Sequence, residues 1–149
     1  MPQDTHEPTD GVPPALGRLR VALDDAYQRA SRELGLTAQQ AELLCAAMRP
    51  AAVGDLAAAL RCDRSNVTRL VDRAAAHDLV RRHQGRDRRV SMIELTPKGS
   101  ELARRFIASL DAQTTALRAS WPDRRKRQAV ALLDEISAAL QHRERGEGL

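Results

Sequence analysis

The chain has 149 residues, the size of one domain or of one domain with an added oligomerisation element. Only 2% of the residues are aromatic, and the apolar residues are mainly Ala, Leu and Val, which favours helices over a β-sandwich or barrel. Two cysteines, Cys45 and Cys62, are too few for a disulfide-stapled secreted domain, and their spacing fits no zinc site.

The net charge of +4 is unevenly distributed along the chain. Residues 61–89 contain nine arginines and four aspartates, a net charge of +5, so the rest of the chain has a net charge of −1. A basic segment of this kind is the electrostatic footprint of a nucleic-acid-binding surface. The alternative is a solvated basic face on a helical bundle.

The N-terminal segment and the hydropathy of the chain argue against export and against a membrane span. Residues 1–12 are predicted to be a disordered tail, and they lack the basic and apolar opening of a signal peptide. The longest stretch without a charge or a histidine, residues 34–41, has eight residues, whereas a membrane span needs roughly 20. We therefore expect a cytoplasmic protein without a membrane partner.

The sequence then predicts four helices, at 13–35, 38–48, 53–60 and 64–77. Gly35 is expected to end the first helix, and Thr37 with Gln40 fits a capping box at the start of the second. Asp63 is a preferred N-cap for the fourth helix. Helical periodicity predicts that the fourth helix buries one apolar stripe. That stripe consists of Val67, Leu70, Val71, Ala74 and Ala75.

A β-hairpin is predicted next, with strands at 79–82 and 89–95 and a polar turn at 83–88. The order of these elements is that of a winged helix-turn-helix over 36–95: a helix, a short helix, a turn, another helix and a hairpin. A short helix and a tight turn hold the following helix out from the surface, where it can enter the DNA major groove. The basic segment covers this turn, helix and hairpin.

Two long helices follow the hairpin. Thr96 is the expected N-cap and Pro97 the first residue of a helix that runs to about Ser120. Trp121 and Pro122 interrupt the helical pattern, and a last helix is predicted at 123–142. Residues 143–149 are expected to fray. The fold class is therefore mainly α with a small β-hairpin wing, together with a helical region formed by the terminal helices.

Several stretches resemble one known family of proteins. They are LTAQQ at 36–40, DLAAAL at 55–60, DRSNVTRLVDR at 63–73, LVRR at 79–82, and DRR at 87–89 followed five residues later by LTPKG at 95–99. These stretches resemble the MarR (multiple antibiotic resistance regulator) transcription factors, and the likeness extends over about 13–142. The resemblance implies a homodimer that reads a pseudo-palindromic operator, with the helices at 13–35 and 96–142 interleaved with those of the partner.

The apolar stripes of the terminal helices agree with a dimer, because these helices are too long and too poor in aromatic residues to bury themselves singly. A monomeric six-helix bundle is the alternative. The expected interface residues are Leu16, Leu19, Leu23, Val130, Leu133, Ile136 and Leu140.

The helical wheel of 64–77 predicts the residues that read DNA bases. Ser65, Arg69 and Arg73 point away from the buried stripe, with Asn66 and Thr68 at the edges. The wing is expected to contact DNA through four residues of its turn. These are Arg86, Asp87, Arg88 and Arg89. The expected phosphate contacts are Arg64, Arg81 and Arg82.

The Asp-x-Arg pattern at 87–89 has a defined use in the resembling family. It implies that Arg89 enters the minor groove with Asp87 orienting its guanidinium, since carboxylate and guanidinium form a two-point hydrogen bond. Arg86 and Arg88 would then lie on phosphates. The alternative is that all three arginines follow the DNA backbone.

Two departures from the family pattern affect the backbone. Asp78 stands where the family commonly has Gly, so a positive φ there would carry a cost. Ala52 stands where the third helix often has a Thr or Ser cap, so the start of that helix is expected to be weaker.

Other site types find little support in the sequence. There is no phosphate-binding Gly-rich loop, no nucleophile elbow and no converging set of histidines, so we expect no enzyme activity, no cofactor and no metal. Cys45 fits a core thiol, whereas Cys62 precedes a helix N-terminus between two arginines and is a candidate redox sensor.

The predicted function is that of a DNA-binding transcriptional regulator, a homodimeric repressor that a small-molecule effector releases from its operator. No effector is assigned, because only Tyr27, Phe106 and Trp121 could stack on an aromatic ligand. The alternatives are a MarR-like interaction protein acting through its terminal helices and a regulator that senses oxidants through Cys62. The nine arginines of the basic segment favour DNA binding.

Overall fold

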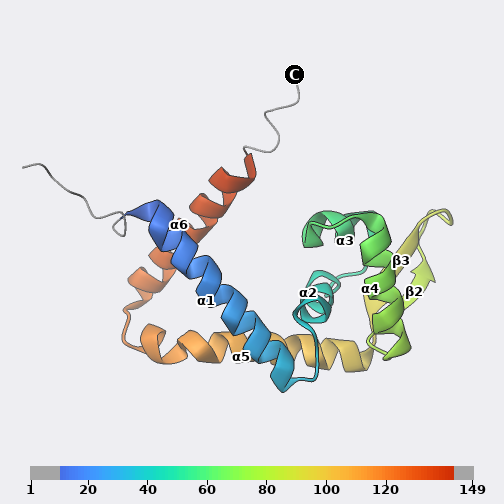
Figure 1. Ribbon diagram of the computed structural model, residues 1–149, viewed down its shortest axis with the longest axis horizontal. Coiled ribbons are helices and arrows are strands. Elements are labelled where there is room, and N and C mark those ends of the chain that lie inside the picture. Colours follow the sequence, from blue (N-terminus) through green and yellow to red (C-terminus); the bar gives the residue numbers. More distant parts are fainter. Residues whose placement is uncertain (1–10, 143–149) are drawn as a thin grey trace, which may run out of the picture. The chain divides into compact units, whose positions relative to one another are not determined.

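The structure is a computed structural model that describes residues 11–142. It is mainly helical with one small sheet, which confirms the predicted fold class (Figure 1). Residues 1–10 and 143–149, within the predicted tail and frayed end, lie outside the described residues. The elements are α1 (Val12–Glu33), α2 (Ala38–Ala46), β1 (Ala51–Ala52), α3 (Val53–Leu60), α4 (Arg64–Ala76), β2 (Val80–Gln84), β3 (Ser91–Leu95), α5 (Pro97–Ala119) and α6 (Asp123–His142).

The chain divides after Leu110 into two compact units.

The end of α1 and the start of α2 are set by local sequence signals, as predicted. Gly35 has a φ of 69°, and the N–H of Leu36 donates to the Ser31 carbonyl at 2.9 Å, which closes α1 with a left-handed turn. The Gln40 N–H donates to Thr37 Oγ1 at 3.1 Å while the Thr37 N–H donates to Gln40 Oε1 at 3.0 Å. This reciprocal capping box fixes the start of α2.

The sheet has three strands in the order β1-β3-β2, all antiparallel. Strand β1 was not predicted: its two residues pair with β3, Ala51 opposite Ile93. The hairpin strands are displaced from their predicted limits, because pairing continues outward to Gln84 opposite Ser91. Residues 89 and 90, expected in the second strand, belong to the turn, where the Val90 N–H donates to the Asp87 carbonyl.

The core of the first unit lies where α2, α3, α4 and the sheet meet. Leu43, Val67 and Ile93 are fully buried there, and Phe106 of α5 packs edge-to-face on Tyr27 of α1 with ring centroids 5.2 Å apart. The stripe predicted for α4 is confirmed except at its last position. Ala75 is exposed, although its neighbour Ala74 in the same last turn of α4 is fully buried.

The junction between α4 and α5 depends on two backbone features. Asp78 adopts the left-handed conformation with a φ of 57°, as the departure from the family's Gly at this position suggested. Its carbonyl accepts a hydrogen bond from the Thr96 hydroxyl at 2.6 Å, and Thr96 Oγ1 in turn accepts from the Gly99 N–H at 3.0 Å. A Cβ at Gly99 would lie 1.9 Å from the Leu79 carbonyl oxygen, so only glycine permits this close approach of α5.

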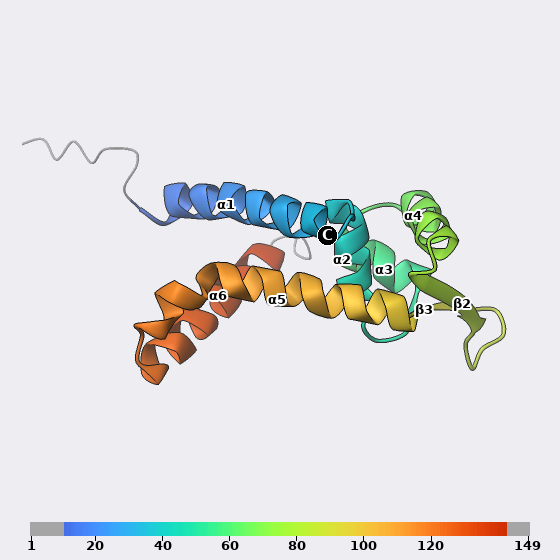
Figure 2. The same ribbon diagram turned by 90° about the horizontal axis from the view of Figure 1, so that it is seen from below.

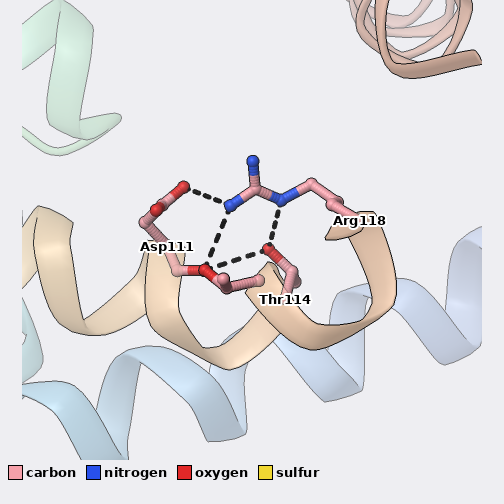
Figure 3. A network of polar contacts seen from close by, with 4 residues as sticks. Asp111, Thr114 and Arg118 are labelled. Atoms are coloured by element: carbon pink, nitrogen blue, oxygen red, sulfur yellow. Dashed lines mark hydrogen bonds and ion pairs between the residues drawn. The ribbon is translucent and has the colours of Figure 1, made fainter. Parts of the chain in front are cut away.

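The second unit begins at Asp111 and contains the end of α5 and all of α6. Arg118 there pairs with the Asp111 carboxylate and donates from Nε to Thr114 Oγ1 at 3.0 Å, which ties together the last turns of α5 (Figure 3). After the break, the Arg125 guanidinium lies 4.7 Å from the centre of the Trp121 ring. Within residues 11–142, no helix is long and apolar enough to span a membrane.

Candidate nucleic-acid interface

Helix α4 is held at its start by the Asp63 carboxylate. Asp63 Oδ1 accepts from the Asn66 N–H at 2.8 Å and from the Ser65 hydroxyl at 2.6 Å, and Oδ2 accepts from Asn66 Nδ2 at 3.0 Å. These hydrogen bonds, first of all that from Ser65, lower the pKa of Asp63. Ser65 and Asn66 are exposed, as predicted. Their side chains, however, are already hydrogen-bonded to the Asp63 carboxylate that caps the helix.

The exposed face of α4 presents its arginines without carboxylate partners. Neither Arg69 nor Arg73 forms an ion pair within the described chain, and Arg73 Nε donates only to the Arg69 carbonyl at 3.4 Å. Thr68 is half-buried, and its hydroxyl donates to the Arg64 carbonyl at 2.8 Å. Both guanidiniums are thus available to accept an external partner, whereas Thr68 is already hydrogen-bonded within the helix.

The wing is the hairpin of β2 and β3 with its connecting turn, and it projects beyond α4 in both views (Figures 1 and 2). Arg86, Arg88 and Arg89 are exposed on the turn, and none has an ion pair among residues 11–142. Asp87 Oδ1 accepts from the backbone N–H of Arg89 at 3.0 Å. The carboxylate therefore stabilises the turn, while its predicted bond to the Arg89 guanidinium is not formed in this state.

Two other predicted phosphate contacts are already paired with carboxylates. Arg82 Nη2 of β2 lies 2.5 Å from Asp72 Oδ1 of α4, and this ion pair links the wing to the exposed face of the helix. Arg81 pairs with Glu94, which stands directly opposite it in the β-ladder and also lies 3.3 Å from His83 Nε2. Sequence reasoning missed both ion pairs, since they depend on strand register and on where the hairpin meets α4.

A hollow of about 330 Å³ separates the start of α3 from the wing. Arg64 and Arg89 line it, and the Arg64 guanidinium lies against Gly54, where a Cβ would be 2.6 Å from Nη2. Ala52 provides no side-chain cap for α3, as the sequence indicated, so the first N–H groups of that helix lack a side-chain acceptor. The hollow is basic and concave, and it lies between the two elements predicted to enter DNA grooves.

The residues predicted for a dimer interface are largely exposed in the single chain. Leu19 and Leu23 of α1 are 40% and 47% exposed, and Val130, Leu133 and Leu140 of α6 are between 50% and 61% exposed. Leu16 and Ile136 are half-buried.

Both cysteines lie within residues 11–142, and neither belongs to a group of candidate metal ligands there. Cys45 and Cys62 are both half-buried free thiols that pack beside the core. Burial, and next the Glu42 carboxylate, raise the pKa of the Cys45 thiol. No group of three His, Cys, Asp or Glu residues within 11–142 could hold a metal ion.

Comparison with known proteins identifies the fold. A MarR-family transcriptional regulator from Rhodococcus sp. RHA1 superposes with a TM-score of 0.72 at 24% identity, covering 89% of this chain and 96% of that chain. CouR from Rhodococcus jostii RHA1, bound to p-coumaroyl-CoA, superposes with a TM-score of 0.71 at 26% identity, covering 86% of this chain and 92% of that chain. Bordetella bronchiseptica BpsR is a protein whose binding to DNA is regulated by 6-hydroxynicotinic acid. It superposes with a TM-score of 0.67 at 24% identity, covering 89% of this chain and 96% of that chain. No family model and no curated protein matches the sequence.

Proposed function

The chain has the fold of the MarR-family transcriptional regulators, as its motifs indicated, and we propose that it is a DNA-binding transcriptional regulator. The observation that carries this proposal is a set of arginines on α4 and the wing that have no ion pair within residues 11–142. Unpaired guanidiniums on one surface attract phosphates and release their counterions. The set comprises Arg64, Arg69, Arg73, Arg86, Arg88 and Arg89.

Helix α4 is the proposed reader of the major groove. Arg69 and Arg73 lie one turn apart on its exposed face, and an Arg there can donate two hydrogen bonds to guanine O6 and N7. Ser65, Asn66 and Thr68 complete this face. The Ser65 hydroxyl and the Asn66 amide must give up their hydrogen bonds to Asp63 before they can bind bases. Their contribution to base recognition is therefore smaller than that of the arginines.

The wing is the proposed reader of the adjacent minor groove. Arg89 enters this groove in the proposal, and Asp87 supports it by ordering the turn through the Arg89 N–H. Arg86 and Arg88 contact phosphates, and Arg64 does so from the hollow beside α3. Arg81 and Arg82 assist as phosphate contacts only by sharing their guanidiniums with Glu94 and Asp72.

The protein acts as a homodimer on a pseudo-palindromic operator in this proposal. Residues 36–95 form the DNA-binding part, and residues 13–35 and 96–142 form the dimerisation helices. The support is the exposure of the α6 stripe, since apolar side chains that remain 50% to 61% exposed along one helix are typical of an interface.

The regulator is further proposed to be a repressor that a small molecule releases. CouR is bound to p-coumaroyl-CoA and NadR to 4-hydroxyphenylacetate, and both structures share the fold of this chain at TM-scores of 0.71 and 0.72. Release of DNA requires that the effector binds more tightly to a conformation with low DNA affinity.

A salt titration tests the proposal. The full chain is titrated against a labelled random-sequence duplex by fluorescence anisotropy at several salt concentrations. We expect log K to fall linearly with log salt, with a slope of about −0.9 for each phosphate contacted. Replacing Arg88 with Gln should make the slope shallower by about 2, one phosphate per subunit. A flat titration would contradict DNA binding and favour an interaction protein that acts through its terminal helices.

A further inference from the structure

The second residue of helix α3 is a glycine, Gly54, and the guanidinium of Arg64 lies against it. A Cβ on residue 54 would be 2.6 Å from Arg64 Nη2 and 3.5 Å from both Cζ and Nε. Non-bonded heavy atoms repel each other strongly at 2.6 Å, so the guanidinium occupies the space that a side chain on residue 54 would need. The observed position of Arg64 therefore depends on the absence of a side chain there.

The fold of α3 gives no other reason for this glycine. Gly54 is helical and lacks the positive φ of Gly35, so alanine could adopt its backbone conformation. The three atoms nearest to its Cβ position all belong to the flexible end of the Arg64 side chain, whereas those at Gly99 belong to the backbone of Leu79. Glycine also stabilises a helix less than alanine does. The room left for Arg64 thus explains why a glycine stands here.

Arg64 in this position lines the hollow of about 330 Å³ between α3 and the wing, together with Arg89. The hydroxyl residues Thr68 and Ser91 also line it, and none of its lining residues is acidic. Arg64 forms no ion pair within residues 11–142. A concave surface with two guanidiniums and no carboxylate attracts an anion, and the anion that the proposed function supplies is a DNA phosphate.

We propose that Gly54 is a positioning residue for DNA binding. By leaving the space beside the α3 backbone open, it holds the Arg64 guanidinium in the hollow, where Arg64 binds one backbone phosphate in each subunit of the proposed dimer. An arginine that is already in place loses less conformational freedom when it binds, and this raises the affinity. The inference rests on the proposed function and adds to it an uncharged residue.

Gly54→Ala tests this role by separating stability from DNA binding. The variant retains every charge, and its urea unfolding midpoint should equal that of the wild type or exceed it, because alanine favours the helix and the displaced side chain is flexible. Its affinity for a random-sequence duplex, measured by fluorescence anisotropy at fixed salt, should nevertheless fall about fivefold, the effect of ordering one more side chain in each subunit.

Two arginine variants provide matched backgrounds for this substitution. Arg64→Gln and Arg88→Gln each remove one positive charge, but Arg88 does not line the hollow. Adding Gly54→Ala to Arg64→Gln should cause no further loss of affinity, because the guanidinium that the new Cβ would displace is already absent. Adding it to Arg88→Gln should cause the full fivefold loss, since residues without a shared partner act additively.

The inference is overturned if Gly54→Ala binds the duplex as tightly as the wild type or lowers the unfolding midpoint. It is also overturned if Gly54→Ala weakens the Arg64→Gln protein as much as the Arg88→Gln protein. Failure of the proposed function is distinct from these outcomes, because it would give a flat salt titration of the wild type. A steep wild-type titration with an unaffected Gly54→Ala variant would remove only the role of Gly54.

Discussion

The elements from α2 to β3 and helix α6 all have apolar residues along one face, yet they bury these residues to different degrees. Leu43, Leu44 and Ile93 in the first are fully buried. In α6, Val130 and Leu133 are 59% and 50% exposed, and none of its residues with a described side chain is buried. The first segment therefore contains its own core, whereas α6 has an apolar face that residues 111–142 of its own unit leave exposed.

If the proposed dimer forms through α6, folding and association have separate physical origins. The α2–β3 segment has a core of its own within the chain, whereas the stability of α6 would then depend on protein concentration. Substitutions in α6 should accordingly change association, and substitutions around α4 and the wing should change folding or DNA binding while association is preserved.

The largest effect is expected in α6. Leu133→Asp places a charge in the proposed interface, where it would be buried without a partner, and should raise the dissociation constant of the dimer by at least about a hundredfold. Sedimentation equilibrium measures this change. Ala138→Asp, on the opposite face of the same helix, should leave the dimer intact. Equal effects of the two variants, or a monomeric wild type at micromolar concentration, would contradict the assignment of this face.

A smaller effect, on folding, is expected at the junction of α4 and α5. In Gly99→Ala the new Cβ would clash with the Leu79 carbonyl, so α5 must shift, at a cost of about 1–3 kcal/mol in the free energy of unfolding. Gly17→Ala is the matched control, because no atom lies within 4 Å of its Cβ position in α1. That variant should be more stable by about 0.5–1 kcal/mol. Urea denaturation compares the two, and equal stabilities would show that α5 does not pack closely on Leu79.

The third prediction concerns sequence readout by α4. Arg69→Ala should weaken binding to a selected operator by about 1–3 kcal/mol per half-site and relax the preference at one symmetric base pair. Binding to random duplex should fall less. The measurement is competition anisotropy on both duplexes, with the sedimentation behaviour of the variant unchanged. Equal losses on operator and random duplex would make Arg69 a phosphate contact instead.

The fourth prediction separates two roles of Asp87 in the wing. Asp87→Ala removes the acceptor for the Arg89 N–H, and DNA binding should weaken about fivefold despite the loss of a negative charge, since one hydrogen bond contributes about 1 kcal/mol. Asp87→Asn retains an acceptor and should weaken binding less. Arg89→Lys should be nearly as harmful as Arg89→Ala if the fork of the guanidinium matters. Tighter binding by Asp87→Ala would mean that the carboxylate only repels DNA.

Most helix limits could be predicted because their signals are local. Gly35 with a positive φ, the Thr37–Gln40 box and the Asp63 cap each act within a few residues of the chain. The limits of the strands were predicted less well. Strand β1 exists only because two alanines meet β3 some 40 residues later in the chain, and no local pattern indicates that pairing.

The candidate site shows the same division between local and distant information. The exposure of Arg69 and Arg73 follows from the helical period, and the structure bears it out. The pairing of Arg82 with Asp72 depends on where the hairpin meets α4, which the sequence does not specify. Composition therefore indicated that this surface is basic, and tertiary structure was needed to separate its unpaired arginines from its paired ones.

The smallest effect is expected at Asp78, where the sequence pattern and the structure agree on a strained backbone. Its φ of 57° disfavours any residue with a Cβ, and Asp tolerates it better than most. Asp78→Gly should therefore raise the free energy of unfolding by up to about 1 kcal/mol, whereas Asp78→Ala should lower it by a similar amount. Thermal unfolding resolves both shifts. The Asp78 carbonyl, which accepts from Thr96, is retained in both variants, so a difference between them reports the backbone conformation. If Asp78→Ala instead stabilised the protein, φ at this position would have to relax to a negative value. The dissociation constant of the proposed dimer should be unchanged in both variants, because folding of this segment is expected to be independent of α6.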